Sequence, residues 1–348
     1  MPAPIGTRAP AALLALALFA ATPSAPQSTS PSRPSPNRIT LDVVVTPKSG
    51  APVAGLQKRD FTILDNRVPR PIAAFQSIAG THSPIEVVLV VDAVNINFIN
   101  IAYEREQLDK FLHANSGHLA QPISLAFFTD TGTEVQEGPS SDGNAVSASL
   151  DKYALGLRDI RRSSIYGDLD RFQLSLTALE SLVTKEAARP GRKIILWVSP
   201  GWPLLSRPTI NLDARQSDYY FSQIVAMSTQ LRNGNITLYS VDPLGAGQAV
   251  GWEFHYDEFL EGITKPGQVD LGDLALQVLA VQSGGLALSA SNDIADLLER
   301  CMADTSAYYE LSFDAPPADH RDEYHQLDIK MSEPGLTART RTGYYDQP

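Results

Sequence analysis

The stretch Ile85–Asn97, which reads IEVVLVVDAVNIN, is the centre of this chain's architecture. Its run Val87–Val91 contains only aliphatic residues and has no polar face, which is typical of a strand buried on both sides in a parallel sheet. The run ends at Asp92, and ligand sites of open α/β sheets form just beyond the carboxyl ends of the strands. Asp92, followed by the polar Asn95 and Asn97, is therefore the first candidate site.

Strand and helix patterns alternate on the carboxyl side of this stretch as far as residue 305. Further strands are expected at 123–129, 132–137, 193–199, 236–242 and 285–289. Helices are expected at 103–113, 147–157, 168–188, 217–232, 271–283 and 293–305. This alternation predicts the α/β class, with a doubly wound, mostly parallel sheet flanked by helices. Residues 244–267 are rich in glycine, proline and aromatic residues, which indicates an excursion loop.

Short strand patterns stand at both ends of the α/β region. They cover 39–46, 60–64 and 72–78 before it, and 307–314, 324–331 and 336–341 after it. Three short strands cannot form a stable unit alone. We therefore expect 39–80 and 306–345 to pair in one small β unit beside a core domain at 84–305. Two separate small domains are the alternative.

The amino terminus has the features of an export signal. Arg8 precedes the apolar run Ala11–Ala21, and small residues follow at Ser24 and Ala25. This pattern predicts a signal peptide at 1–25, and about a dozen apolar residues are too few for a permanent membrane span. Residues 26–38 are rich in proline and serine and indicate a linker. We expect an exported chain, periplasmic or extracellular, with no integral membrane segment after signal removal.

Composition excludes several classes of function. The formal net charge is −11, which disfavours nucleic acid or an anionic membrane surface as the main partner. The single cysteine, Cys301, excludes an intramolecular disulfide and is expected to face the core from a helix. The sequence contains no G-x-S-x-G, H-E-x-x-H or paired-cysteine motif, so we expect no enzyme. His320 and His325 are expected in a solvated loop that leads into a strand, rather than at a metal.

Segments on both sides of the core resemble a known family. They read VVVTPKSGAPVAGLQKRDFTILDNRVPRPIAAF (43–75), LAVQSGGLAL (279–288), YYELSF (308–313), HQLDIKM (325–331) and GLTARTRTGYY (335–345). Together with the strand that ends at Asp92 and those that end at Ser199 and Asp242, they resemble secreted bacterial proteins with a von Willebrand factor A-type domain. The resemblance covers about residues 39–345.

The resemblance implies a metal-ion-dependent adhesion site, but this chain departs from its pattern. The family motif is Asp-x-Ser-x-Ser, with a threonine and an aspartate from later loops around Mg²⁺. Asp92 matches the first position and Ser164 retains a hydroxyl at the threonine position. Val94 and Ile96 replace the two serines, and Pro200 replaces the later aspartate. Mg²⁺ needs near-octahedral oxygen ligation, so we expect no metal and no cofactor, with Asp92 and Ser164 as the weak candidates. Both residues are expected to cap the segments that follow them.

The resulting hypothesis is an exported protein-interaction or adhesion-type module. The binding face would be the strand-end face of the sheet, without a bridging metal, and the partner an unknown protein or envelope macromolecule. The residues assigned to it are Asp92, Asn95, Asn97, Thr129, Asp130, Ser164 and Trp202. Trp202 is expected as an exposed aromatic anchor, the type of residue that is enriched in interfaces. Asp92→Ala is expected to cost about 1 kcal/mol, the loss of an ordinary cap in water. A hydrolase that uses Asp92 and a ligand-free envelope component are the alternatives.

Overall fold

The structure is a computed structural model that describes residues 37–80, 85–96, 98–136, 138–153, 165–202, 212–245 and 255–348, together with Met1. The expected signal peptide and nearly all of the linker lie outside the described residues. Residues 37–348 form one compact unit. Among the described residues, no helix is both long and apolar enough to cross a membrane.

The central sheet has β5 (Ile85–Asp92) in its middle. Its strands follow the order β11-β10-β9-β5-β6-β7, and β8 also pairs with β6. Their bounds are β6 (His118–Thr129), β7 (Gly132–Val135), β8 (Ser140–Asp142), β9 (Arg192–Val198), β10 (Ile236–Val241) and β11 (Ala287–Leu288). All pairings are parallel except those of β7 and β8 with β6. The expected mixed α/β architecture with a mostly parallel sheet is present, and the edge strand at 132–135 agrees with the expectation.

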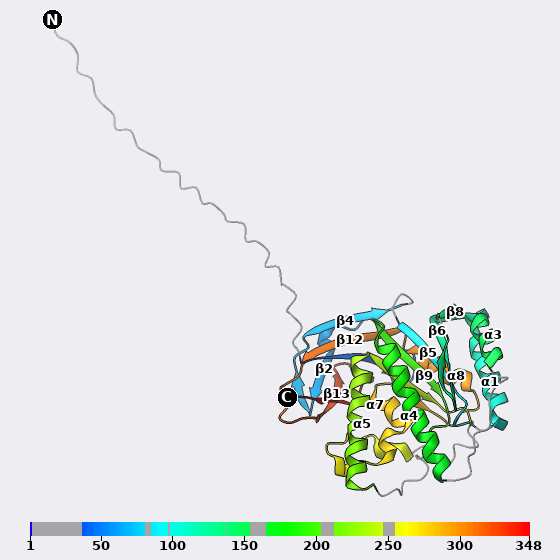
Figure 1. Cartoon of the computed structure of the whole chain (residues 1–348). Coiled ribbons are helices and arrows are strands. Elements are labelled where there is room, and N and C mark those ends of the chain that lie inside the picture. Colours follow the sequence, from blue (N-terminus) through cyan, green and yellow to red (C-terminus); the bar gives the residue numbers. More distant parts are fainter. Residues whose placement is uncertain are drawn as a thin grey trace. The chain divides into compact units, whose positions relative to one another are not determined.

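Helices cover both faces of this sheet (Figure 1). Alternate residues of β5 face opposite sides, because Val88 and Val90 pack in one buried cluster and Val87 and Leu89 in the other. The first cluster contains residues of α4 (Ile165–Ala187), α5 (Ala214–Asn233) and α7 (Leu276–Gln282). The second contains residues of α1 (Phe98–Leu112), α3 (Gly143–Tyr153) and α8 (Ile294–Ala303). The aliphatic run of β5 thus lies where helices cover both faces of the sheet and exclude water. Cys301 is buried on α8, as expected.

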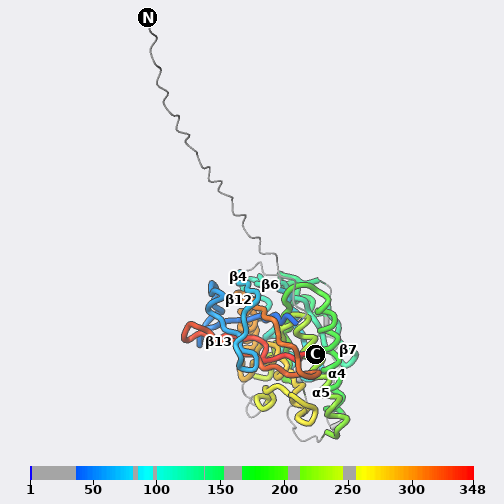
Figure 2. The backbone as a smooth tube through the Cα atoms, turned by 90° about the vertical axis from the view of Figure 1, so that its left-hand side faces the viewer, coloured from blue at the N-terminus to red at the C-terminus, as the bar shows by residue number. Residues whose placement is uncertain are grey.

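Strands from the two ends of the chain pair with each other. One sheet has the order β14-β1-β12-β4 and another β15-β13-β2-β3. Their bounds are β1 (Arg38–Pro47), β2 (Phe61–Asp65), β3 (Val68–Arg70), β4 (Ala74–Ala79), β12 (Ala307–Asp314), β13 (Glu323–Met331), β14 (Leu336–Arg339) and β15 (Gly343–Asp346). The blue and red ends of the folded chain lie side by side in Figure 2, in agreement with the antiparallel β1–β12 and β2–β13 ladders. The inner faces of both sheets share one apolar cluster.

One connection differs from the sequence expectation. The turn at Asn66–Arg67, where both residues have positive φ, does not lead to the strand at 72–78. It leads into the three-residue β3, which pairs with β2. β4 instead pairs with β12 in the other sheet. β3 contains Pro69 and is too short to give a pattern, so the sequence does not identify it as a strand.

The connections between the larger elements are short or irregular. They include η1 (Lys58–Asp60), α2 (Ala114–Gly117), η3 (His255–Phe259), η4 (Pro266–Gln268) and η5 (Leu271–Leu274). The described part of the expected excursion loop, from residue 255 onward, contains only the short 3₁₀ turns η3 and η4. The helix expected at 271–283 is divided into η5 and α7, because Ala275 between them is extended.

Candidate functional site

The candidate site lies where the central strand of the sheet ends. β5 pairs in parallel with β9 on one side and β6 on the other, so the carboxyl ends of the three strands meet at one edge. Asp92 is the last residue of β5. Ser199 follows β9, and Thr129 is the last residue of β6. Side chains from three strands therefore converge at this edge, which is called the strand-end face below.

The carboxylate of Asp92 is buried and accepts hydrogen bonds from five protein donors. Its Oδ1 accepts the backbone N–H groups of Val94 and Asn95, both at 2.9 Å. Its Oδ2 accepts Nδ2 of Asn95 at 2.8 Å and Nε1 of Trp197 at 3.1 Å. The Ser199 hydroxyl also donates to this carboxylate. Burial raises the pKa of Asp92, while the hydrogen bonds from Asn95, Ser199 and Trp197 oppose that rise.

The capping role expected for Asp92 is confirmed, but its expected exposure to water is wrong. Asp92 has no exposed surface. The expectation treated a carboxylate at a strand end as a surface group, whereas Trp197 from the neighbouring strand and the turn after β5 enclose it. Asp92 therefore connects β5, β9 and that turn as a structural centre, rather than presenting a free carboxylate to a partner.

Val94 and Ile96 are buried in the core. Val94 belongs to the cluster under α4 and α5, and Ile96 lines a small cavity beside α1. Neither residue offers a side-chain oxygen, and neither faces solvent. The two positions that carry serines in the family motif thus contribute to hydrophobic packing in this chain.

Asn95 joins the strand-end turn to helix α4. Its Nδ2 donates to Asp92 and also to Oγ of Ser175 at 3.0 Å, and the Ser175 hydroxyl donates to the Arg171 carbonyl at 2.8 Å. Within the described ranges, the Oδ1 atom of Asn95 is buried without a hydrogen-bond partner. Asn95 is half-buried and positions the turn. Asn97 and Ser164 lie outside the described residues, as do Arg161 and Arg162.

Sequence reasoning did not identify Glu104, a second buried carboxyl group close to Asp92. Glu104 lies on α1, and its Oε1 has no hydrogen-bond partner among the residues that the structure describes. Burial and then the charge of Asp92 raise the pKa of Glu104 well above its usual range. Both residues line a cavity of about 30 Å³, roughly the volume of one water molecule. The signal was present in the sequence, because Glu104 lies four residues before Leu108 and eight before Leu112, on the buried stripe of the helix.

Thr129 and Asp130 form the turn between β6 and β7. The Thr129 hydroxyl bonds Oγ1 of Thr131 at 2.9 Å and donates to the Gly132 carbonyl at 3.2 Å. Asp130 is exposed. These two residues reach solvent at the strand-end face, whereas Asp92 does not.

Trp202 is not the exposed anchor that was expected, because only 2% of it is accessible. Its ring packs edge-on against Trp197 at 6.0 Å and against Phe172 at 6.3 Å between centroids. In the described part of the chain, the large aromatic side chain that is exposed is that of Tyr219 on α5, at 49% accessible. Tyr219 packs on Tyr220, whose ring contacts Phe172, so this row of rings extends from the end of β9 to solvent.

Asp242, directly after β10, is a further titratable group at this edge. Its Oδ1 accepts the N–H of Leu244 at 2.8 Å. Burial raises the pKa of Asp242 to about 6. The position of Asp242 beside the ends of β9 and β5 follows from the parallel pairing of β10 with β9.

His325 also differs from its expected environment. It is buried rather than solvated, its Nδ1 lies 2.7 Å from Oδ1 of Asp65, and its ring stacks on Tyr344. The hydrogen bond with Asp65 raises the pKa of His325, against the opposing effect of burial. The pair belongs to the β2–β13 ladder and lies away from the strand-end face. His320 is exposed, as expected.

The donor set at the strand-end face does not fit Mg²⁺. This ion requires about six oxygen ligands in an octahedron. Both oxygens of Asp92 already accept protein hydrogen bonds, and Val94 and Ile96 supply no ligand. Among the described residues, no group of three or more His, Cys, Asp or Glu side chains could hold a metal ion.

Comparisons with known proteins do not assign a family. No protein-family model matches the chain, and no curated protein matches it. Among solved structures, proximal thread matrix protein 1 from the mussel byssus is 10% identical, with a TM-score of 0.39 over 69% of this chain and 51% of that one. The manganese-loaded TRAP protein of Plasmodium vivax is 8% identical, with a TM-score of 0.34 over 77% of this chain and 96% of that one.

The pilus adhesin SpaC from Lactobacillus rhamnosus GG is 8% identical, with a TM-score of 0.35 over 83% of this chain and 49% of that one. This chain thus spans about half the length of the mussel protein and of the adhesin. Likenesses at these scores do not identify a function.

Proposed function

We propose that this chain is an exported module that binds another macromolecule through the strand-end face of a von Willebrand factor A-like domain, without a bridging metal ion. The doubly wound sheet with its antiparallel edge strand β7 supports the resemblance to that domain type. The amino-terminal pattern with Arg8 and the apolar run Ala11–Ala21 supports export to the periplasm or the medium.

The observation that carries the proposal is the hydrogen bonding of Asp92. A metal-bridged contact needs a carboxylate with free lone pairs and neighbouring hydroxyls, and a water-filled space for the ion. Here Oδ1 accepts two backbone hydrogen bonds and Oδ2 accepts two side-chain hydrogen bonds, and the carboxylate is fully buried. Contact with a partner therefore depends on side chains that reach solvent at the same edge.

The solvent-accessible groups described at this edge are mixed in character. Asp130 supplies an exposed carboxylate in the turn after β6. Tyr219 supplies an exposed aromatic ring that rests on Tyr220. An aromatic residue with buried support is the usual energetic centre of a protein interface, and polar groups around it set orientation. We place Tyr219 and Asp130 at the binding face, in place of Trp202.

We also propose that the chain is not an enzyme. The alternative hydrolase would have to use Asp92 as a base or nucleophile, but this carboxylate is enclosed by five donors and has no accessible surface. A group in that role must reach a substrate within hydrogen-bond distance. A ligand-free envelope component remains the second alternative, and the binding test below separates it from a binding module.

The test uses purified protein with cell-envelope and culture-medium fractions, in buffer with EDTA and in buffer with Mg²⁺. We expect retention of the same partner in both buffers, and loss of retention for Tyr219→Ala. The matched control is Val68→Ala on β3, because Val68 is 50% exposed and Tyr219 is 49% exposed. Retention that requires Mg²⁺, or that Val68→Ala reduces as much as Tyr219→Ala does, would contradict the proposal. Equal retention by all three proteins would contradict the assigned face.

A further inference from the structure

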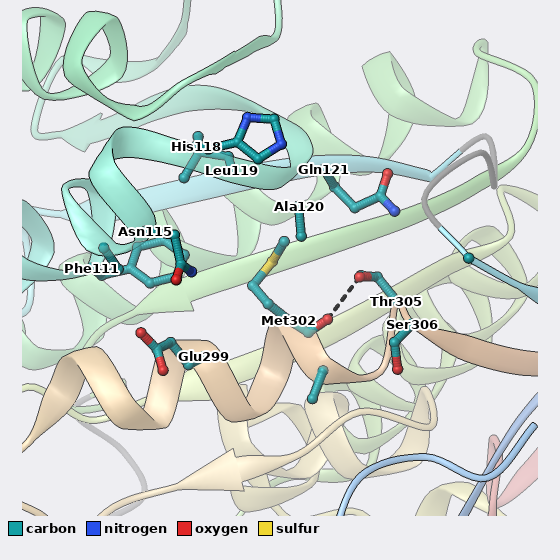
Figure 3. Close-up of a pocket in the computed structure, with 13 residues that line it drawn as sticks. Phe111, Asn115, His118, Leu119, Ala120, Gln121, Glu299, Met302, Thr305 and Ser306 are labelled. Atoms are coloured by element: carbon teal, nitrogen blue, oxygen red, sulfur yellow. Dashed lines mark hydrogen bonds between the residues drawn. The ribbon is translucent and has the colours of Figure 1, made fainter.

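A cavity of about 340 Å³ lies at the edge of the core opposite the strand-end face (Figure 3). Its walls come from the carboxyl end of α1 with the turn after it, the first residues of β6, and the carboxyl end of α8 with the residues before β12. Because β6 begins at His118 and ends at Thr129, the cavity and Asp92 lie at opposite ends of the parallel strands. The cavity therefore does not belong to the proposed macromolecule-binding face.

The walls of the cavity are mainly apolar. Phe111, Leu119 and Met302 are buried side chains that line it, and Ala114 and Ala303 keep space open between them. In Figure 3 the Met302 side chain lies in the middle of the lining residues. A thioether chain of this kind adapts its shape to a ligand at little cost. A volume of this size is at the small end of the range for organic ligand sites.

Gln121 and Thr305 are the most buried polar residues of the lining, and each is only 3% exposed. The nearby Thr305 hydroxyl is already used, because it donates to the Met302 carbonyl at 2.7 Å. Gln121 can both donate to and accept from a ligand.

The charge of the lining selects the kind of ligand. Glu299 supplies an exposed carboxylate, and the basic side chain among the described lining residues is His118, since they include no lysine or arginine. Figure 3 shows Glu299 and Asn115 at one end of the lining, with Gln121, Thr305 and Ser306 at the other. Lys110 lies within electrostatic range of Glu299, but its ammonium group is hydrogen-bonded to Asp293, so an organic cation can pair with the exposed Glu299 carboxylate.

The turn that carries Asn115 supports a specialised role. Asn115 and Ser116 both have positive φ, at 50° and 59°. Two successive non-glycine residues in the left-handed region store backbone strain, and such strain gathers at binding sites. The turn joins α1 to β6 and places Asn115 beside the cavity.

We propose that this cavity binds a small organic amine. Its ammonium group pairs with Glu299, its apolar body lies against Phe111, Leu119 and Met302, and a polar group at its far end bonds the Gln121 amide. This proposal does not rest on the proposed function at the strand-end face.

Tyramine is the probe, because it joins an ammonium group, an aromatic body and a terminal hydroxyl. Two related compounds are compared with tyramine. Phenethylamine lacks the hydroxyl, and 3-(4-hydroxyphenyl)propionate has a carboxylate in place of the ammonium group. Binding to the full chain is measured by saturation-transfer NMR and by titration. We expect tyramine to bind more tightly than phenethylamine, and the carboxylate analogue not to bind.

Three variants test the assignments. Glu299→Gln should weaken tyramine about two- to fivefold, the loss of one solvent-exposed ion pair. Gln121→Leu should weaken tyramine and leave phenethylamine unchanged. Ala303→Leu should fill the cavity and abolish binding of both amines. Glu106→Gln, on the exposed side of α1, makes the same charge change outside the cavity and should have no effect.

Each variant is first shown to be folded by its circular dichroism and its thermal transition. The proposal is overturned if neither amine binds the unaltered chain at millimolar concentration, or if the carboxylate analogue binds as tightly as tyramine. It is also overturned if Ala303→Leu binds tyramine as the unaltered chain does. Equal weakening by Glu106→Gln and Glu299→Gln would show a general charge effect and likewise overturn it.

Discussion

Replacing Asp92 with alanine should destabilise the fold by about 3 kcal/mol, because the change leaves buried hydrogen-bond donors without an acceptor. This value is larger than the roughly 1 kcal/mol expected for an exposed cap. The difference comes from the position of Asp92, which is fully buried beneath Trp197 and the turn after β5.

The magnitude follows mainly from the fate of the most deeply buried donors. Nε1 of Trp197 and the N–H of Val94 lie in the interior and lose their acceptor, at about 1–3 kcal/mol each. Asn95 keeps Ser175 as a partner of its Nδ2, and the Ser199 hydroxyl can rotate toward another acceptor. The loss of a buried carboxylate returns part of the energy that its burial requires. These contributions leave a net loss of about 3 kcal/mol.

Urea unfolding, followed by tryptophan fluorescence and circular dichroism, measures this loss. Asp130→Ala is the control, because Asp130 is exposed at the same face and should change the free energy of unfolding by no more than about 0.5 kcal/mol. A loss of 1 kcal/mol or less for Asp92→Ala would refute the structural role of this carboxylate. Stabilisation of the unaltered chain by millimolar Mg²⁺, absent in Asp92→Ala, would refute the metal-free site.

Three further changes test the surroundings of the site and the two antiparallel sheets. Trp202→Ala should cost about 3–5 kcal/mol in urea unfolding, because Trp202 fills the core; a loss near that of a surface change would contradict this. His325 has a raised pKa through Asp65, so the stability it contributes is fully present below its unfolded pKa of about 6.5 and is lost as pH rises through the folded value. The melting temperature of His325→Gln should therefore fall below that of the unaltered chain by more at pH 6 than at pH 8.5, and an equal difference at both would contradict the pairing. Glu104 also has a raised pKa, and as an acid it destabilises the fold increasingly as pH rises above its unfolded value of about 4.3. Glu104→Gln should raise the melting temperature more at pH 7.5 than at pH 4.5, and a fall at pH 7.5 would contradict the buried-acid assignment.

Much of the fold could be predicted because its signals are local. Val87–Val91 has no polar face, and the structure places these residues between two layers of helices. Pairing between the two end segments could be predicted, but not the choice of β12 as the partner of β4, because a short strand carries no signal for the strand it joins. A turn such as Asn66–Arg67 shows that the chain reverses, but not which strand it joins.

The site was harder to predict, because burial at a strand end depends on what packs over it. Whether Trp202 points to solvent or into the core depends on Phe172 and Trp197, which come from two other elements. Glu104 could have been identified, since its spacing to Leu108 places it on the buried face of α1. Tyr219 could not, because no local pattern separates it from its neighbour Tyr220, which is half-buried.

The apolar residues at 94 and 96 and the buried carboxylate at 92 have one physical explanation. A carboxylate at the end of a central strand can either face an ion or bind the backbone and side chains around it. In this chain Val94 and Ile96 pack into the core and draw the turn inward, which brings the N–H groups at 94 and 95 onto Oδ1. Trp197 then supplies a donor to Oδ2. Once this network has formed, removing Asp92 is costly whether or not a metal ever binds. A motif search that finds only the aspartate therefore detects a folding constraint, and the binding chemistry has to be sought in the side chains that the turn leaves exposed.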